Sequence, residues 1–76
     1  MKEILETIIN TLVSNKEAVS INQIDGEQSI IFEVKVAEED MGKIIGRQGS
    51  IAKSIRTIMK AVGAREHKKV SVEFID

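Results

Sequence analysis

The chain has 76 residues with no Pro, Cys or Trp, a length that suits one small domain over residues 1–76. Hydrophobic residues make up 42% and charged residues 30%, a balance typical of a folded domain rather than a disordered or membrane-embedded chain. Zero Cys excludes disulfides and thiolate chemistry, and one His leaves few ligands for a metal. The sequence shows no targeting or membrane-spanning stretch, so we expect a cytoplasmic protein without cofactor, metal or membrane contact.

The net charge of −1 hides a strong separation of charge along the chain. Residues 1–40 sum to −6, residues 41–69 to +7 and residues 70–76 to −2. A positive segment of this kind indicates one surface that faces a polyanion, within a protein whose overall charge is balanced. An ordinary solvated surface is the alternative interpretation.

Apolar residues at helical spacing predict a first helix over residues 2–14, which Asn15 suits as an end. Alternating residues on both sides of the turn dipeptide Asp25-Gly26 then predict a β-hairpin. We expect its second strand to turn one face to the core. That face carries Ile30, Phe32, Val34 and Val36.

Three acidic residues, Glu38 to Asp40, favour the start of a short second helix, which Gly46 ends. The spacing from Ile51 to Val62 predicts a third helix, with Gly63 as its C-terminal stop. A last alternating run, residues 70–75, predicts a third strand. The order α-β-β-α-α-β is that of an α+β domain.

The segment Gly46-Arg47-Gln48-Gly49 is a tight turn between the second and third helices, in which two glycines permit close approach of another chain. A G-x-x-G spacing alone is weak evidence, so the context decides. Here the next helix would offer unpaired N–H groups to a phosphate, and Arg47 adds a charge at the tip.

Basic residues surround this turn. Lys43 precedes it, and Lys53, Arg56 and Lys60 follow at i, i+3 and i+7, on one side of the third helix. Beside them lies an aliphatic surface on which unstacked bases could rest. We therefore expect the turn and this stripe to bind a sugar–phosphate backbone.

The string from Gly42 to Gly49, followed by Ile51-Ala52-Lys53, resembles the I-I-G-x-x-G motif of KH domains. The element order is similar to the type II, prokaryotic form of that fold, and nearly the whole chain resembles the KhpA family of small bacterial single-KH proteins. This resemblance implies a two-layer α/β fold with a three-stranded mixed sheet and helices packed on one face.

The resemblance also implies function and partners. Single-stranded RNA would lie between the G-x-x-G loop and the adjoining sheet edge, and the protein would act as an RNA chaperone in post-transcriptional regulation linked to cell division, cell shape and envelope or cell-wall homeostasis. Homodimers, or heterodimers with the larger KH protein KhpB, would form. The RNA-binding residues that it implies are Lys43, Ile44, Ile45, Gly46, Arg47, Gln48, Gly49, Ser50, Lys53 and Arg56.

Two other classes of function stay open beside RNA binding. The fold could serve protein–protein interaction, pairing with another chain through the third helix with little RNA affinity of its own. An enzyme is disfavoured, because no acid is spaced with a base or nucleophile and so small a domain leaves little room for a substrate pocket. RNA-recognition motifs and OB modules are disfavoured too, since only Phe32 and Phe74 are aromatic and both are expected on core faces.

Overall fold

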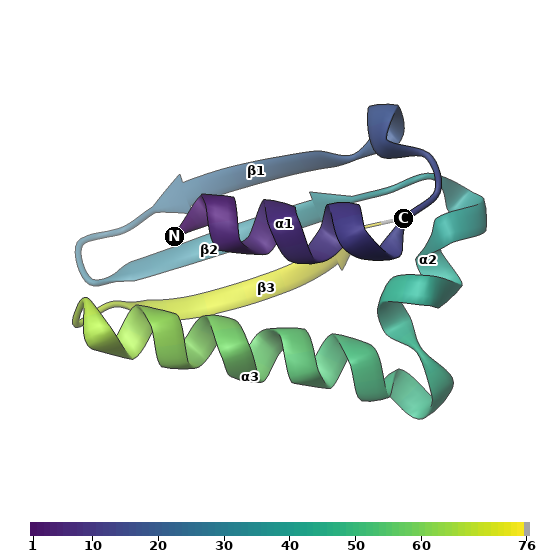
Figure 1. Ribbon diagram of the computed structural model, residues 1–76. Helices are drawn as coiled ribbons and strands as arrows, with labels where there is room; N and C mark the ends of the chain where they lie inside the picture. The colour runs from purple at the N-terminus through teal and green to yellow at the C-terminus, as the bar shows by residue number, and fades with distance from the viewer. Residues whose placement is uncertain (76) are drawn as a thin grey trace.

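The computed structural model describes residues 1–75, and its elements follow the expected order (Figure 1). The helices and strands are α1 (Lys2–Leu12), β1 (Ser20–Asp25), β2 (Ser29–Lys35), α2 (Glu38–Ile45), α3 (Ser50–Arg65) and β3 (Lys69–Ile75). Short 3-10 turns lie at Lys16–Ala18 (η1) and Arg47–Gly49 (η2). The α+β class and the order α-β-β-α-α-β are confirmed. Within residues 1–75 no helix is both long and apolar enough to cross a membrane.

The three strands form one mixed sheet in the order β1-β2-β3. Central β2 pairs antiparallel with β1 and parallel with β3, and α1 and α3 lie over one face of the sheet (Figure 1). The parallel register sets Ile30 opposite Val70 and Phe32 opposite Val72, so these side chains share the covered face. The predicted mixed sheet with helices on one face is confirmed.

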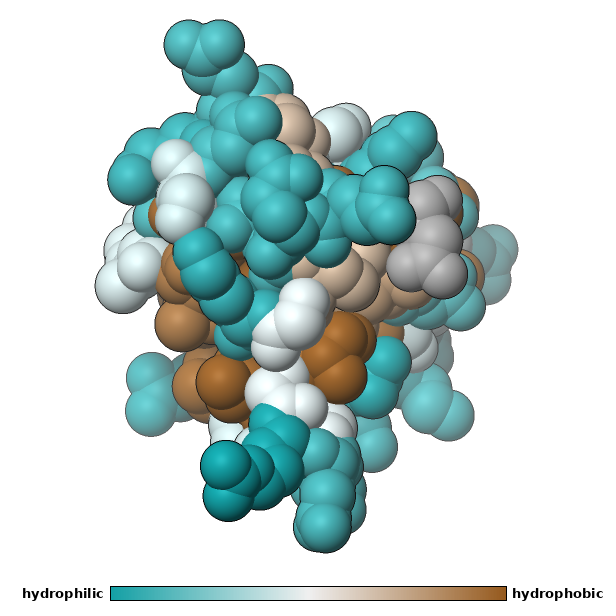
Figure 2. Space-filling model, turned by 90° about the vertical axis from the view of Figure 1, so that its right-hand side faces the viewer, coloured by the Kyte–Doolittle hydropathy of each residue, from teal (hydrophilic) through white to brown (hydrophobic). Residues whose placement is uncertain are grey.

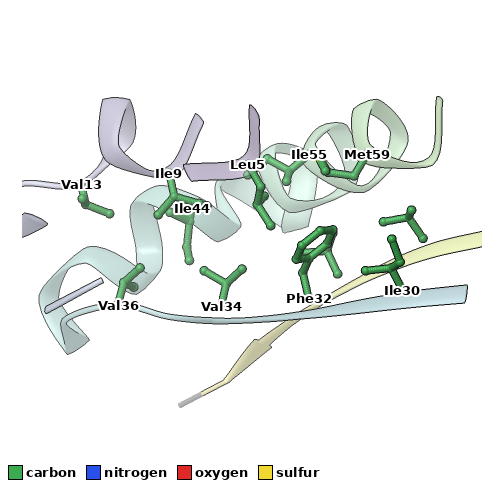
Figure 3. Packing of buried hydrophobic residues seen from close by; sticks show 12 residues of the cluster. Leu5, Ile9, Val13, Ile30, Phe32, Val34, Val36, Ile44, Ile55 and Met59 are labelled. Atoms are coloured by element: carbon green, nitrogen blue, oxygen red, sulfur yellow. The ribbon is translucent and has the colours of Figure 1, made fainter. Parts of the chain in front are cut away.

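The core lies between this face and the helices (Figure 3). Phe32 and Val34 of β2 are completely buried, and Leu5 and Ile9 of α1 and Met59 of α3 meet them from the helical layer. Because the side chains of a strand alternate, Glu33 and Lys35 lie on the open face. The core-face prediction for β2 is therefore confirmed.

The hairpin between β1 and β2 is also confirmed, with a connection longer than the predicted turn dipeptide. Residues Gly26 to Gln28 connect the strands, and the Gly26 N–H donates to the Ser29 carbonyl at 2.8 Å. Gly26 is not among the residues with positive φ, so its backbone does not use the conformation that only glycine adopts readily.

Two helix boundaries differ from the prediction. The first helix ends at Leu12 rather than at residue 14, because Val13 is extended and the N–H groups of Ser14 and Asn15 donate to the Asp40 carboxylate. The third helix continues through Gly63 to Arg65, so the prediction that Gly63 stops it is wrong.

Gly63 has a packing role instead. A Cβ at this position would lie 2.3 Å from Cγ2 of Val70 and 2.9 Å from the Lys68 carbonyl oxygen. Only glycine lets α3 approach the start of β3 so closely. The helix ends later through His67, whose φ of 58° is left-handed, while the N–H groups of His67 and Lys68 donate to the carbonyls of Ala64 and Gly63. This is the Schellman arrangement, with histidine where glycine is usual.

Candidate nucleic-acid interface

The Gly46 to Gly49 turn has a backbone that most residues cannot adopt. Gly46 has φ 76° and ψ 178°, Gln48 has φ 56°, and Gly49 has φ 75°. The conformation of Gly46 is essentially restricted to glycine, whereas Gln48 and Gly49 are in the left-handed helical region. The chain thus turns sharply between α2 and α3 (Figure 1) and leaves Arg47 and Gln48 exposed at the tip.

The two glycines serve different purposes. A Cβ on Gly46 would lie 2.6 Å from Cγ1 of Ile51, so this glycine is needed for packing against the start of α3. A Cβ on Gly49 would meet no atom within 4 Å. The backbone at Gly49 therefore faces open space, where a second chain can approach it closely.

The N-terminus of α3 faces the same open space. The Ser50 N–H donates to the Arg47 carbonyl, and no side chain caps the other N–H groups of the first turn. Free N–H groups together with the positive end of the helix dipole attract an anion. The turn and the start of α3 therefore form a surface suited to a phosphate.

The basic stripe of α3 begins beside this surface. Lys53, Arg56 and Lys60 are all exposed, and none of them forms an ion pair with a described residue. Arg56 and Lys60 line one side of a groove whose other side is the edge strand β3, from Val70 to Glu73. A bound chain could follow α3 from the turn into this groove.

The structure places the remaining predicted site residues differently. Lys43 on α2 is half-exposed, but its Nζ lies 3.2 Å from Oδ1 of Asp40 and donates to Oγ of Ser14. Ile44 is completely buried in the core and offers no surface to a ligand, although the resemblance places it among the RNA-binding residues. Ile45 is partly exposed. Ile44 and Ile45 differ in burial because consecutive residues of a helix such as α2 point in different directions.

Asp40 is the residue near the site whose role the sequence did not reveal. Its carboxylate is completely buried, and Oδ1 and Oδ2 accept the N–H groups of Ser14 and Asn15 at 3.0 and 2.9 Å. These two hydrogen bonds, with a smaller contribution from Lys43, lower the pKa of Asp40 although burial opposes them. The sequence suggested only a favourable charge at the start of α2. Asp40 instead joins that helix to the end of α1.

The end of the molecule that carries α2 and the turn is largely hydrophilic (Figure 2). Hydrophobic surface gathers at the lower left of that view, on the side of α1 and α3. Among residues 1–75, no group of three or more His, Cys, Asp or Glu side chains is arranged to hold a metal ion. His67 is exposed and follows the C-terminal end of α3, at the opposite end of that helix from the turn.

A mixed three-stranded sheet, helices on one face and a G-x-x-G turn between two helices together define a KH domain. A family profile described as "KhpA/KhpB, KH domain" matches residues 2–74. The chain therefore belongs to the KhpA/KhpB KH-domain family, as the resemblance in the sequence indicated.

Full-length relatives agree with this assignment. The chain is 56% identical over 75 residues to "RNA-binding protein KhpA" of Clostridium acetobutylicum, covering 99% of this chain and 100% of the relative. Identity to the protein of the same name is 43% over 74 residues in Borreliella burgdorferi, covering 97% and 90% of the two chains. In Aquifex aeolicus it is 38% over 76 residues, covering 100% and 96%. The names of these relatives describe RNA binding and no reaction.

Proposed function

We propose that the chain binds single-stranded RNA on the surface formed by the Gly46 to Gly49 turn, α3 and the exposed edge of β3. The observation that carries this proposal is the open backbone of the turn at the uncapped start of a basic helix. The names of the relatives support the choice of RNA as the ligand.

Under this proposal, some of the predicted residues would contact the RNA directly and others would act indirectly. Gly46, Gly49 and Ser50 would bring the backbone close to a phosphate, with Arg47 and Gln48 at the tip of the turn. Ile45, Lys53 and Arg56 would contact the RNA farther along. Lys43 and Ile44 would act indirectly, because the side chain of Lys43 is bonded to Asp40 and to Ser14 and that of Ile44 is buried. The Ser14 contact and the burial of Ile44 would hold α2, and therefore the turn, in place.

Fluorescence anisotropy with labelled single-stranded RNA tests this assignment. We expect the wild type to bind and the double variant Arg47→Asp, Gln48→Asp to lose binding, because negative charge at the tip repels phosphate. An aspartate tolerates the left-handed conformation at position 48, so the variant should fold, which circular dichroism checks. A matched control is Lys16→Asp, Gln28→Asp. It changes the charge equally at two exposed positions outside the proposed surface.

Undiminished binding by the folded tip variant would show that the turn is not the site. Equal losses in the tip and control variants would show that only overall charge matters. No RNA binding by the wild type would reject the proposal and favour the alternative function in protein–protein interaction.

A specific observation supports protein–protein association as a second function. Ile4 of α1 and Ile58 of α3 are 43% and 45% exposed, and both line one apolar depression between their helices. A second depression, lined by Ile8, Leu12 and Ile51 among others, continues between these helices and shares Ile58 with the first. A surface of this kind is typical of an interface, and we propose that a second copy of the chain covers it.

Light scattering tests this association. We expect a dimer for the wild type and a folded monomer for Ile58→Asp, because a buried, unpaired carboxylate opposes association. Thr57→Asp is the matched control, since Thr57 is an exposed neighbour that does not line these depressions. A wild-type monomer, or a dimer that tolerates Ile58→Asp, would argue against this interface.

Further roles follow from the family and are proposed with it. They are heterodimer formation with KhpB, RNA-chaperone activity in the cytoplasm, and a part in cell division and envelope homeostasis. Dimerisation would raise RNA affinity by linking two weak sites. If the Ile58→Asp monomer binds RNA as tightly as the wild type, dimerisation does not contribute to affinity.

A further inference from the structure

The groove between α3 and β3 has two sides of different charge. Arg56 and Lys60 form the side on α3, whereas Glu73 lies on the β3 side, and the space between them is about 300 Å³, at the small end of ligand pockets. Glu73 would repel a phosphate that α3 attracts. An RNA strand bound as proposed above would therefore place its phosphates along α3 and turn its bases towards β3.

Arg56 differs from the two lysines of the stripe because it extends across this groove. Its Nε donates to the Val72 carbonyl at 3.1 Å, and its guanidinium carbon lies 5.2 Å from the centroid of the Phe74 ring. Both contacts are with β3, on the side where the bases would lie. The side chains of Lys53 and Lys60 make no hydrogen bond or ion pair with any residue from 1 to 75.

The free hydrogen-bonding groups of Arg56 and of the Val72 backbone beside it are donors, whereas Glu73 on the same strand is an acceptor. Arginine has five N–H donors, and the bond to Val72 uses one of them. That bond also occupies the Val72 carbonyl. The N–H of a strand residue points to the same side as its carbonyl, so the Val72 N–H faces the groove as a further donor. A base that presents two adjacent acceptors would satisfy these donors best.

Two bases have such an edge. Guanine presents O6 and N7, the pair that arginine contacts most often in nucleic acids, and cytosine presents N3 and O2. Adenine and uracil alternate donors and acceptors along their edges. The Phe74 ring lies against one side of the Arg56 guanidinium and so orders this side chain before RNA binds. Arg56 would therefore lose less conformational freedom on binding.

We propose that Arg56 is the base-selecting residue of this RNA-binding surface and favours guanine or cytosine over adenine and uracil. This proposal rests on the proposed function and changes the expected role of Arg56 from phosphate contact to base contact. Phosphate contacts position a strand, and only base contacts distinguish sequences.

Anisotropy with four labelled RNA decamers tests the proposal: oligo-A and the alternating sequences AG, AC and AU. We expect the wild type to bind the AG or the AC decamer about tenfold more tightly than oligo-A and the AU decamer. The variant Arg56→Lys keeps the charge and loses the planar fork, so it should bind all four decamers with nearly equal affinity. Lys60→Gln is the matched control, expected to weaken all four equally and preserve the preference.

The four decamers separate the possible results. Preference for AG alone assigns guanine, and preference for AC alone assigns cytosine. Equal binding of all four by the wild type, or a preference that survives Arg56→Lys, would overturn the role of Arg56 and leave RNA binding intact. No binding of any decamer would instead reject the proposed function. Thermal denaturation of each variant shows whether it is folded, and equal binding of all four decamers by the wild type overturns the proposal without any variant.

Discussion

Among single residues, Asp40 depends on distant neighbours, whereas His67 depends on a strained local backbone. Asp40 accepts two backbone N–H groups from a segment more than twenty residues away in the sequence, and it is completely buried. His67 ends α3 in a conformation that costs a residue with a Cβ about 1–2 kcal/mol. Each arrangement leads to a prediction about stability.

Replacing Asp40 with Asn should lower the melting temperature at neutral pH, on the order of 5 °C or more, because one buried N–H loses its acceptor and Lys43 loses its ionic partner. The lowered pKa adds a pH dependence. An aspartate whose folded pKa lies below its usual 3.8 stabilises the fold above that pH, and this stability is lost as the pH falls through the folded pKa.

The difference in melting temperature between wild type and Asp40→Asn should therefore be largest near neutral pH and shrink below about pH 4. Thermal denaturation followed by circular dichroism over a pH series measures it. Glu39→Gln is the control, because Glu39 is exposed in the same helix turn. A difference that stays constant with pH would contradict a charged Asp40 as the source of the stability.

Replacing His67 with Gly should stabilise the protein by about 0.5–1 kcal/mol, since glycine adopts the left-handed conformation without strain but loses more chain entropy on folding. Urea denaturation measures the change. His67→Ala keeps the Cβ and should bring no such gain, so a similar rise in both variants would show that relief of backbone strain is not the cause.

At the scale of elements, α3 joins the parts of the molecule. Its buried side packs on the sheet through Ala52, Ile55 and Met59, its exposed side carries the basic stripe, and its two ends are set by the strained turn and the Schellman arrangement. Shifting or rotating this helix would move the binding surface relative to β3. The close contact at Gly63 fixes that position.

Replacing Gly42 and Gly63, which both lie in helices, with alanine should change the stability of the protein in opposite directions. Alanine is favoured over glycine in a helix by about 1 kcal/mol, so Gly42→Ala in α2, where a Cβ meets nothing within 4 Å, should raise stability. Gly63→Ala should lower it by about 1–3 kcal/mol, because the added Cβ overlaps Val70 and the Lys68 carbonyl. Urea denaturation of the pair measures both changes. A rise for Gly63→Ala would mean that β3 can move away from α3 at little cost.

At the scale of the whole molecule, the separation of charge decides how a protein with a net charge of −1 could bind a polyanion. The +7 of residues 41–69 is carried mainly by the turn, α3 and the approach to β3, which lie on one side of the fold. The acidic residues lie mainly in the preceding elements. The local field, rather than the net charge, governs attraction of an anion.

RNA affinity should therefore fall steeply between about 50 and 200 mM salt. If three or four cationic side chains contact phosphates, the logarithm of the binding constant should fall with the logarithm of the salt concentration with a slope of about −2 to −3 for a single strand. Anisotropy titrations at several salt concentrations measure it, and Lys53→Gln should reduce the slope by about 0.7. A slope near zero would mean that phosphate contacts do not drive binding.

The element order, the core faces of β2 and β3, and the G-x-x-G turn could all be predicted from the sequence, because periodicity and glycine placement are local properties. It placed the end of α1 and the stop of α3 wrongly, and it did not indicate the roles of Asp40 and Gly63 or the contacts of Arg56 with β3. Those depend on contacts between residues 7 to 26 positions apart, such as Arg56 with Val72, that arise only when the helices pack on the sheet. Packing of the helices on the sheet sets these contacts, because a side chain's partner does not follow from its neighbours in the chain.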